Sequence, residues 1–299
     1  MNQDFEIESG VLIEYHGRDE NVIIPDGVKS IGNSAFEYCK NLFSVTIPDS
    51  VKNIGNSAFC GCKLLESVII PDSVTIIGDS AFYNCTNLTS VTIGNSVKNI
   101  GNRAFQECSR LISVIIPDSV KSIEEWAFYD CSSLISVTIR NSATSMGWRA
   151  FCACSSLTSV TVDGAEINLP SPNFRDKTHI FFLLVGKNYQ FTAPLNRTPD
   201  VTNNLIFQMY ASGLDEKGAS AYISENFSAM FPVLINMNNT EILRKILDSE
   251  KFITKKNIDD LIQYAIDQKK YQLQLMLTEY KQQKNWYQNI DDIDKKFKL

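Results

Sequence analysis

Side chains suited to catalysis are scarce in this chain. Only two histidines, His16 and His179, occur among its 299 residues, and they lie far apart in the sequence. A cysteine–histidine dyad would need a cysteine close to one of them. No glycine-rich stretch leads into Gly-Lys-Ser or Gly-Lys-Thr, so the loop that cradles a nucleotide phosphate is missing. We therefore interpret both histidines as structural and predict no catalytic residue and no cofactor.

Long apolar runs and basic stripes are missing as well. The longest apolar run, Ile180 to Val185, has the length of a strand, whereas a membrane span needs about 18 apolar residues. Lysine and arginine number 28 against 34 aspartates and glutamates, without a basic stripe that could neutralise several phosphates. The N-terminus has neither the basic start nor the apolar segment of a signal peptide. These absences predict no membrane insertion, no nucleic-acid partner and a cytoplasmic location.

The strongest pattern that the sequence does contain is a strict repeat in which equivalent positions lie 23 apart. An Ala-Phe pair, a cysteine four residues after the alanine and a leucine three residues after the cysteine recur six times without insertion or deletion. The six pairs begin at Ala35, Ala58, Ala81, Ala104, Ala127 and Ala150. A fixed period of this length is typical of a solenoid, in which each unit buries its apolar face against the next.

Each repeat divides into inward and outward positions. Val91 and Ile93 of one repeat point the same way, because side chains alternate along an extended segment. Gly-Asn-Ser at 94–96, or Pro-Asp-Ser in other copies, then turns the chain. The other interior positions of this repeat are predicted at Leu88, Val97, Ile100, Ala104, Phe105 and Cys108.

The repeat unit also resembles a known family. From Leu42 to Cys62 it reads Leu-x-x-Val-x-Ile-Pro-x-x-Val-x-x-Ile-Gly-x-x-Ala-Phe-x-x-Cys. This pattern is similar to BspA-like leucine-rich repeats of bacterial surface proteins and protozoan proteins, over roughly residues 10–162. The resemblance implies an α/β repeat fold, a solenoid with a parallel β-sheet on the concave side and short turns or 3₁₀ segments on the convex side. An all-α domain is expected to follow it.

The solenoid is predicted to span residues 1–185. Its last repeat is degenerate, since Phe174 still follows Phe151 at the spacing of the repeat, and Ile180 follows Leu157 in the same way. The predicted segments are an N-terminal cap at about 1–24, the degenerate repeat at about 163–185, a connector at 186–200, a small α-helical domain at 201–284 and a tail at 285–299.

Helical patterns are concentrated after residue 198. Thr198-Pro199-Asp200 is expected to start a helix that runs to Met209, because proline is favoured in the first turn. Asn239 or Thr240 is expected to cap a helix from Glu241 to Leu247. Further helices are predicted at 219–231, 258–266 and 273–280. The part from Glu241 to Tyr280 weakly resembles degenerate ankyrin-type helix pairs, without their Thr-Pro-Leu-His motif.

Six of the eight cysteines occupy one slot of the repeat. A free cysteine behaves as a small apolar residue, so this slot predicts a buried ladder of thiols. Cys60 and Cys152 lie outside that slot, and we predict that they are exposed and are the most reactive thiols. Each forms a Cys-x-Cys pair with its neighbour, which resembles half a metal site. The two pairs are four rungs apart, about 20 Å at 4.8 Å per rung, so we predict no metal site.

The residues between the inward strand positions define a predicted binding face on the concave side. Its middle row is serine in all six repeats, and the flanking rows are small, mildly apolar and nearly uncharged. The predicted partner-binding residues are Phe43, Thr46, Glu66, Ile69, Thr89, Thr92, Ile112, Ile115, Ile135, Thr138, Thr158 and Thr161. A solvated surface without a partner is the alternative interpretation of the serines and threonines.

Three large apolar residues continue these rows in the degenerate repeat. Phe181, Phe182 and Leu184 hold the same slots as the residues of the predicted binding face. Large exposed apolar side chains beside a helical domain are typical of its docking site. We predict an interdomain docking role for them, with partner binding as the alternative.

The sequence favours non-catalytic binding of a protein partner of unknown identity by a monomeric chain. The family resemblance implies adhesion or host-surface recognition at a cell surface or after secretion. The missing signal peptide favours an intracellular scaffold instead. An enzyme with an unrecognised site in the helical domain and a purely structural spacer are further alternatives.

Overall fold

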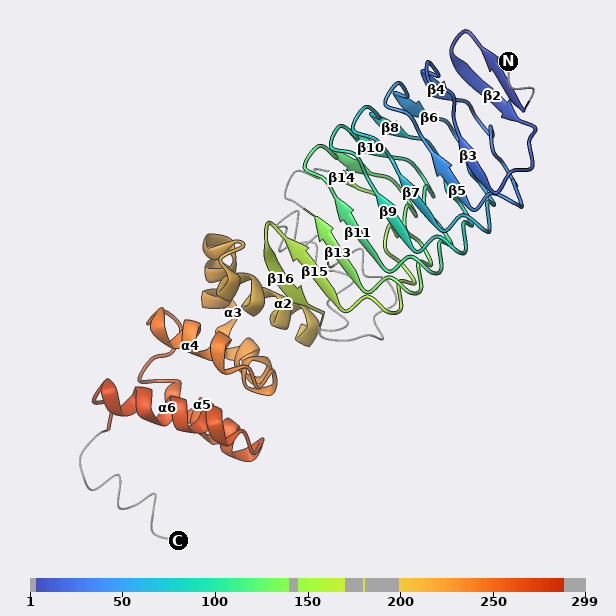
Figure 1. The fold of residues 1–299 in the computed structure, drawn as a ribbon. Coiled ribbons are helices and arrows are strands. Elements are labelled where there is room, and N and C mark those ends of the chain that lie inside the picture. The colour runs from blue at the N-terminus through green and yellow to red at the C-terminus, as the bar shows by residue number, and fades with distance from the viewer. Residues whose placement is uncertain (1–3, 140–144, 170–179, 181–198, 288–299) are drawn as a thin grey trace. The chain divides into compact units, whose positions relative to one another are not determined.

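The computed structural model describes residues 4–139, 145–169, 180 and 199–287. The chain divides into two compact units, residues 1–194 and 195–299. The first is a solenoid of stacked rungs, and the second is helical (Figure 1). The predicted solenoid fold is confirmed, and each unit is described by itself below.

One sheet of the solenoid, called here the long-strand sheet, contains the Leu-x-x-Val-x-Ile segments. Seven parallel strands follow one another along it, and residues 23 apart are partners, as in Val114↔Val137 and Val137↔Val160. The strands are β3 (Asn21–Ile23), β5 (Ser44–Thr46), β7 (Ser67–Ile69), β9 (Ser90–Thr92), β11 (Ser113–Ile116), β13 (Ser136–Ile139) and β15 (Ser159–Val162), with antiparallel β16 (Ala165–Asn168) at the edge.

A second sheet, the short-strand sheet, lies on the other side of each rung (Figure 1). The family resemblance implied short turns or 3₁₀ segments there; turns are present in each repeat, and two residues beside them also pair as short strands. Two residues per rung pair in parallel register because the rungs stack without offset, as in Ile54↔Ile77. Its strands are β1 (Phe5–Glu8), β2 (Val11–Tyr15), β4 (Ser30–Ile31), β6 (Asn53–Ile54), β8 (Ile76–Ile77), β10 (Asn99–Ile100), β12 (Ser122–Ile123) and β14 (Ser145–Met146).

A column of phenylalanine rings fills the centre of the solenoid. Neighbouring rings stack with centroids 4.9 to 5.2 Å apart. Burial of each ring contributes roughly 1.5–3 kcal/mol of transfer free energy, and each stacked pair adds about 0.5–1.5 kcal/mol. The fully buried rings belong to Phe36, Phe59, Phe82, Phe105, Phe128 and Phe151.

Two residues in every rung adopt left-handed backbone conformations. The first precedes Ala-Phe and has φ between 54° and 57°. The second precedes the repeat cysteine, as Tyr38 and Asn84 do. Non-glycine residues seldom adopt this conformation, but here it directs each turn so that its amides bond the next rung, as in Phe59 N–H to the Ala81 carbonyl at 2.7 Å.

Different devices close the two ends of the solenoid. The hairpin of β1 and β2 covers the first rung, and β2 pairs in parallel with β4. At the other end, Asp163 and Gly164 both have positive φ, which suits a two-residue hairpin turn and reverses the chain into β16. This hairpin differs from the degenerate repeat predicted at 163–185. Of the predicted strand at 180–185, only Ile180 lies within the described residues, and it is helical and buried.

The second unit contains five helices within the described residues 199–287, in agreement with the predicted all-α region. They are α2 (Pro199–Ser212), α3 (Glu216–Asn236), α4 (Thr240–Asp248), α5 (Ile258–Asp267) and α6 (Tyr271–Gln283). α2 packs on α3 and α5 on α6, and α4 contacts both α2 and α6. Of the two predicted caps for α4, the structure uses Asn239, whose side-chain oxygen accepts from Glu241 N and Ile242 N.

Candidate functional site

All twelve residues of the predicted binding face lie on the outer surface of the long-strand sheet or just before its strands. Nine are exposed, and Thr89, Thr138 and Thr161 are partly buried. The inward residues between them, such as Val68 and Val114, are buried. The alternation of inward and outward positions was therefore predicted correctly, whereas the binding role of the outward residues stays a prediction.

The apolar members of this face are strongly exposed. Ile69 and Ile115 expose 68% and 66% of their surface, and Ile112, Ile135 and Phe43 each expose close to half. Isolated exposed apolar residues are common on proteins, but a contiguous set on a regular sheet is typical of an interaction surface. Glu66 is the one charged residue among the twelve.

The outer surface of the sheet is hollowed between neighbouring rungs. A depression of about 750 Å³ extends over β9, β11 and β13, and Ser90, Thr92, Ser113, Ile115 and Thr138 contribute to its wall. Asp118, in the turn after β11, also lines it. The backbone groups below are engaged in the parallel ladder. A partner on this face would therefore contact side chains and not a free strand edge.

Polar side chains on this face bond between rungs and hold their positions. The Ser44 hydroxyl donates to Asn21 Oδ1 at 2.6 Å, and the Thr89 hydroxyl donates to the Glu66 carbonyl at 3.1 Å. Such bonds join residues 23 apart, so they repeat the period of the backbone. They give the face an ordered array of small polar groups between the isoleucines.

Phe181, Phe182 and Leu184, the predicted interdomain docking residues, lie outside the described residues, as does His179. Their predicted roles stay predictions.

The cysteine ladder is buried, with one exception at its start. Cys62, Cys85, Cys108, Cys131 and Cys154 each donate their thiol to the phenylalanine carbonyl 26 residues earlier, at 3.0 to 3.2 Å. Burial raises the pKa of the Cys108 thiol to about 12. Cys39 opens the ladder and is only partly buried, although the whole ladder was predicted to be buried, and this partial burial still raises its pKa to about 11.

The prediction that Cys60 and Cys152 are exposed, reactive thiols is wrong. They expose only 5% and 4% of their surface. Beside Cys60, the Tyr38 ring of the preceding rung lies so close that a Cβ at Gly61 would stand 2.3 Å from it. Burial raises the pKa of the Cys60 thiol, which disfavours the reactive thiolate.

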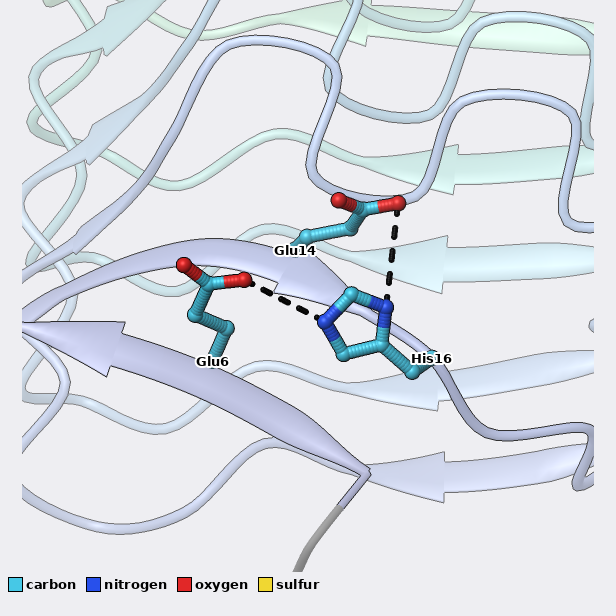
Figure 2. Close-up of polar contacts among 3 residues, drawn as sticks. All are labelled: Glu6, Glu14 and His16. Carbon is cyan, nitrogen blue, oxygen red and sulfur yellow. Dashed lines mark hydrogen bonds and ion pairs between the residues drawn. The ribbon is translucent and has the colours of Figure 1, made fainter.

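On the N-terminal hairpin, the side chain of His16 lies close to those of Glu6 and Glu14 (Figure 2). Glu6 of β1 lies directly opposite Glu14 of β2, and His16 follows two residues later. His16 Nε2 is 3.2 Å from Glu6, and His16 Nδ1 is 3.8 Å from Glu14. Because the two ring nitrogens face different carboxylates and all three side chains are exposed, the arrangement is that of a solvated polar cluster. The sequence analysis missed this cluster.

The repeats match a known family model. A model described as a BspA-type leucine-rich repeat region, in six copies, matches residues 14–93 and 52–180, which together make up more than half of the chain. This chain belongs to the BspA-type leucine-rich repeat family. The resemblance stated from the residues Leu42 to Cys62 is thereby confirmed. Repeat proteins of this kind use extended solenoid surfaces to bind partners.

Solved structures of other leucine-rich repeat proteins are similar to this BspA-type chain. The T. pallidum protein TpLRR is 29% identical with a TM-score of 0.50, and the match covers 55% of this chain and 82% of that one. A protein from Bacteroides ovatus ATCC 8483 is 26% identical with a TM-score of 0.32, over 48% of this chain and 55% of that one. The chain thus spans about half of this second relative. Comparison with the sequences of curated proteins finds no match.

The helices of this BspA-type chain differ from membrane-spanning helices in length or in polarity. Within the residues that the structure describes, every helix is too short or too polar to cross a bilayer.

Proposed function

We propose that this protein is a non-catalytic, monomeric binding scaffold that docks a protein partner on the outer face of the long-strand sheet. The observation that carries the proposal is the set of exposed isoleucines on a nearly uncharged, regular surface, among which Ile69 and Ile115 expose about two thirds of their surface. Burying such side chains in a partner would contribute roughly 25 cal/mol per Å² of apolar area, before the costs of association.

The stiffness of the face supports the same role. The strands from β5 to β15 each lie between two neighbours in the sheet, in register with the repeat, and hydroxyl groups bond from rung to rung. A surface that is already ordered loses little conformational freedom when it binds, so more of the contact energy appears as affinity. A protein surface with apolar groups spaced along the rungs suits such a face.

The direct test is affinity capture by the full chain carrying Ile112→Arg and Ile115→Arg. Two charged side chains on this face, that of residue 115 inside the depression, should abolish binding of any protein that docks there, because its apolar surface would desolvate the charges. The matched control is Ile76→Arg, since Ile76 is likewise exposed but lies on the short-strand sheet. A protein retained by wild type and by the control but lost by the double variant is the expected result.

Two versions of this role differ in the source of the partner. Capture from extracts of the producing cells and from host-cell extracts in parallel distinguishes an intracellular scaffold from adhesion or surface recognition. If the double variant retains the same proteins as wild type, the long-strand face is not the binding site. Sedimentation of the purified chain as a dimer or larger species would contradict the monomer proposal.

A further inference from the structure

The two residues before each Ala-Phe pair change character midway along the solenoid. In the first three rungs, the side chain at the first of these positions accepts a hydrogen bond from the backbone of the next rung. Asn56 N donates to Asn33 Oδ1, Asp79 N to Asn56 Oδ1 and Asn102 N to Asp79 Oδ1, at 2.8 to 2.9 Å. The second is serine in the first three rungs. From the fourth rung onward the pairs are Asn102-Arg103, Glu125-Trp126 and Trp148-Arg149.

Neither the turn nor the core explains these large side chains. The slot has the same left-handed conformation in all six rungs, with φ of 54° at Ser80 and 55° at Trp126. A bulky side chain gains nothing from that conformation, which favours small polar residues and glycine. Arg103, Trp148 and Arg149 are exposed, and Trp126 is partly exposed, so they do not fill the interior.

The four side chains form a compact ridge, called here the Arg–Trp ridge. The Arg103 guanidinium lies over the Trp126 ring at 4.6 Å, and the Arg149 guanidinium lies over the Trp148 ring at 4.0 Å. The two indole rings are 5.7 Å apart and tilted by 55°. Beside them is a hollow of about 270 Å³ lined by Arg103, Gln106, Trp126, Tyr129 and Arg149.

The hollow presents positive charge and hydrogen-bond donors in an acidic surrounding. Its lining contains two guanidinium groups and no carboxylate, whereas acidic side chains outnumber basic ones in the chain up to Gly164. The nearby Glu107 carboxylate already accepts from the Tyr83 hydroxyl and the Gln106 amide. Guanidinium forks pair best with carboxylate, sulfate or phosphate oxygens, and indole and phenol rings offer flat apolar surface.

We propose that the Arg–Trp ridge binds an acidic polysaccharide. A sugar ring packs against the aromatic wall of the hollow, which Trp126 and Tyr129 form, and its carboxylate or sulfate groups pair with Arg103 and Arg149. These arginines are two rungs apart, about 10 Å at the spacing of hydrogen-bonded strands, so they suit anions that recur along one chain. The site is separate from the long-strand face and does not depend on the proposed protein partner.

The backbone of the ridge favours a polysaccharide over an acidic peptide. Extended peptides commonly bind by adding main-chain hydrogen bonds to an open edge. Here the amides of the ridge are used between rungs, since Arg103 N donates to the Glu125 carbonyl and Trp126 N to the Trp148 carbonyl. Side-chain charges and ring faces remain for recognition, and these are what an acidic sugar chain can use.

The repeat itself supplies variants that should fold normally. Arg103→Ser, Trp126→Ser and Arg149→Ser each install the residue that Ser34, Ser57 and Ser80 hold in the same slot. Arg110→Ser is the charge-matched control, because Arg110 is exposed but belongs to a different turn. Circular dichroism and the melting temperature of each variant check the fold before binding is measured.

The experiment is calorimetric titration of the full chain with a heparin-derived octasaccharide. The comparison ligands are the same octasaccharide after desulfation and carboxyl reduction, which carries no anion, and a poly-glutamate peptide. Wild type and Arg110→Ser should bind the sulfated octasaccharide, with affinity that falls as salt is raised. Each ridge variant should bind about tenfold more weakly, because it removes one charge-assisted pair or the stacking surface. Glu125→Asn should strengthen binding, since it removes a negative charge beside Trp126.

Four results would overturn the proposal. They are no binding of the octasaccharide at low salt, equal binding by wild type and the ridge variants, equal affinity for the desulfated and carboxyl-reduced form, and equal or tighter binding of poly-glutamate. The last result would assign the ridge to acidic protein segments instead.

Discussion

At the scale of single residues, the repeat cysteines show how position in the stack controls chemistry. Cys108 lies between rungs on both sides, donates to the Phe82 carbonyl and has its pKa raised to about 12 by burial. Cys39 has the same place in its rung but opens the ladder, so it is only partly buried and its pKa is about 11. Identical sequence slots therefore differ in exposure at the end of the stack.

These pKa values predict a loss of stability in alkaline solution. The ordinary thiol pKa is 9.0, and the folded-state values lie above it. Above pH 9 the unfolded chain therefore releases protons that the folded protein keeps, so stability is full below pH 9 and falls as pH rises through about 11 to 12. Urea unfolding under reducing conditions at pH 8, 9 and 10 measures this. The Cys108→Ala variant should show a smaller decline, and an equal decline would assign the effect to other groups.

At the scale of secondary-structure elements, short helices depend on their caps. α4 has nine residues, and isolated helices of that length are marginal in water. Its buried face, Ile242, Leu243, Ile246 and Leu247, supplies packing, and Asn239 satisfies two amides of the first turn at 3.0 Å each. The cap thus fixes where this helix begins.

Removing that cap should destabilise the helical unit. Asn239→Ala is expected to lower the free energy of unfolding by about 1 kcal/mol, because two N–H groups lose their acceptor. Asn239→Asp retains the acceptor and should stay close to wild type. Denaturant unfolding followed by circular dichroism at 222 nm provides the comparison. Equal losses in both variants would show that the side-chain oxygen is not what stabilises this end of α4.

At the scale of the whole solenoid, stability comes from contacts between neighbouring rungs. Residues 23 apart pair in both sheets, and the phenylalanine rings stack at the same interval. Repeat arrays of this kind are close to a sum of equal units and interfaces. The protein should therefore tolerate deletion of a complete repeat better than a shorter deletion that shifts the following strands out of register.

Two deletions test this expectation. Deleting residues 69–91 removes one complete repeat and joins Val68 to Thr92 in phase, so the shortened solenoid should fold. Deleting residues 69–90 removes one residue fewer, but it places Val91 outward and Thr92 inward, because side chains alternate along a strand. Urea unfolding should give a cooperative transition with a smaller m-value for the first variant and no stable fold for the second. Equal stability of the two would contradict strict register.

The sequence by itself determined the period, the inward and outward strand positions and the places of the five helices. This was possible because each rung packs on the equivalent rung of the next repeat, so a local pattern such as Val91 and Ile93 also describes the tertiary contact. The twelve outward residues of the long-strand sheet followed from the same alternation.

Only the tertiary structure decided features that depend on distances between unlike side chains. It buried Cys60 under the preceding rung, brought Glu6, Glu14 and His16 together through the register of a hairpin, and paired the short strands into a sheet. The change from serine to Arg103, Trp126 and Arg149 is readable in the sequence. That these side chains stack around one hollow is not, because it depends on rotamers and neighbours that no repeat pattern specifies.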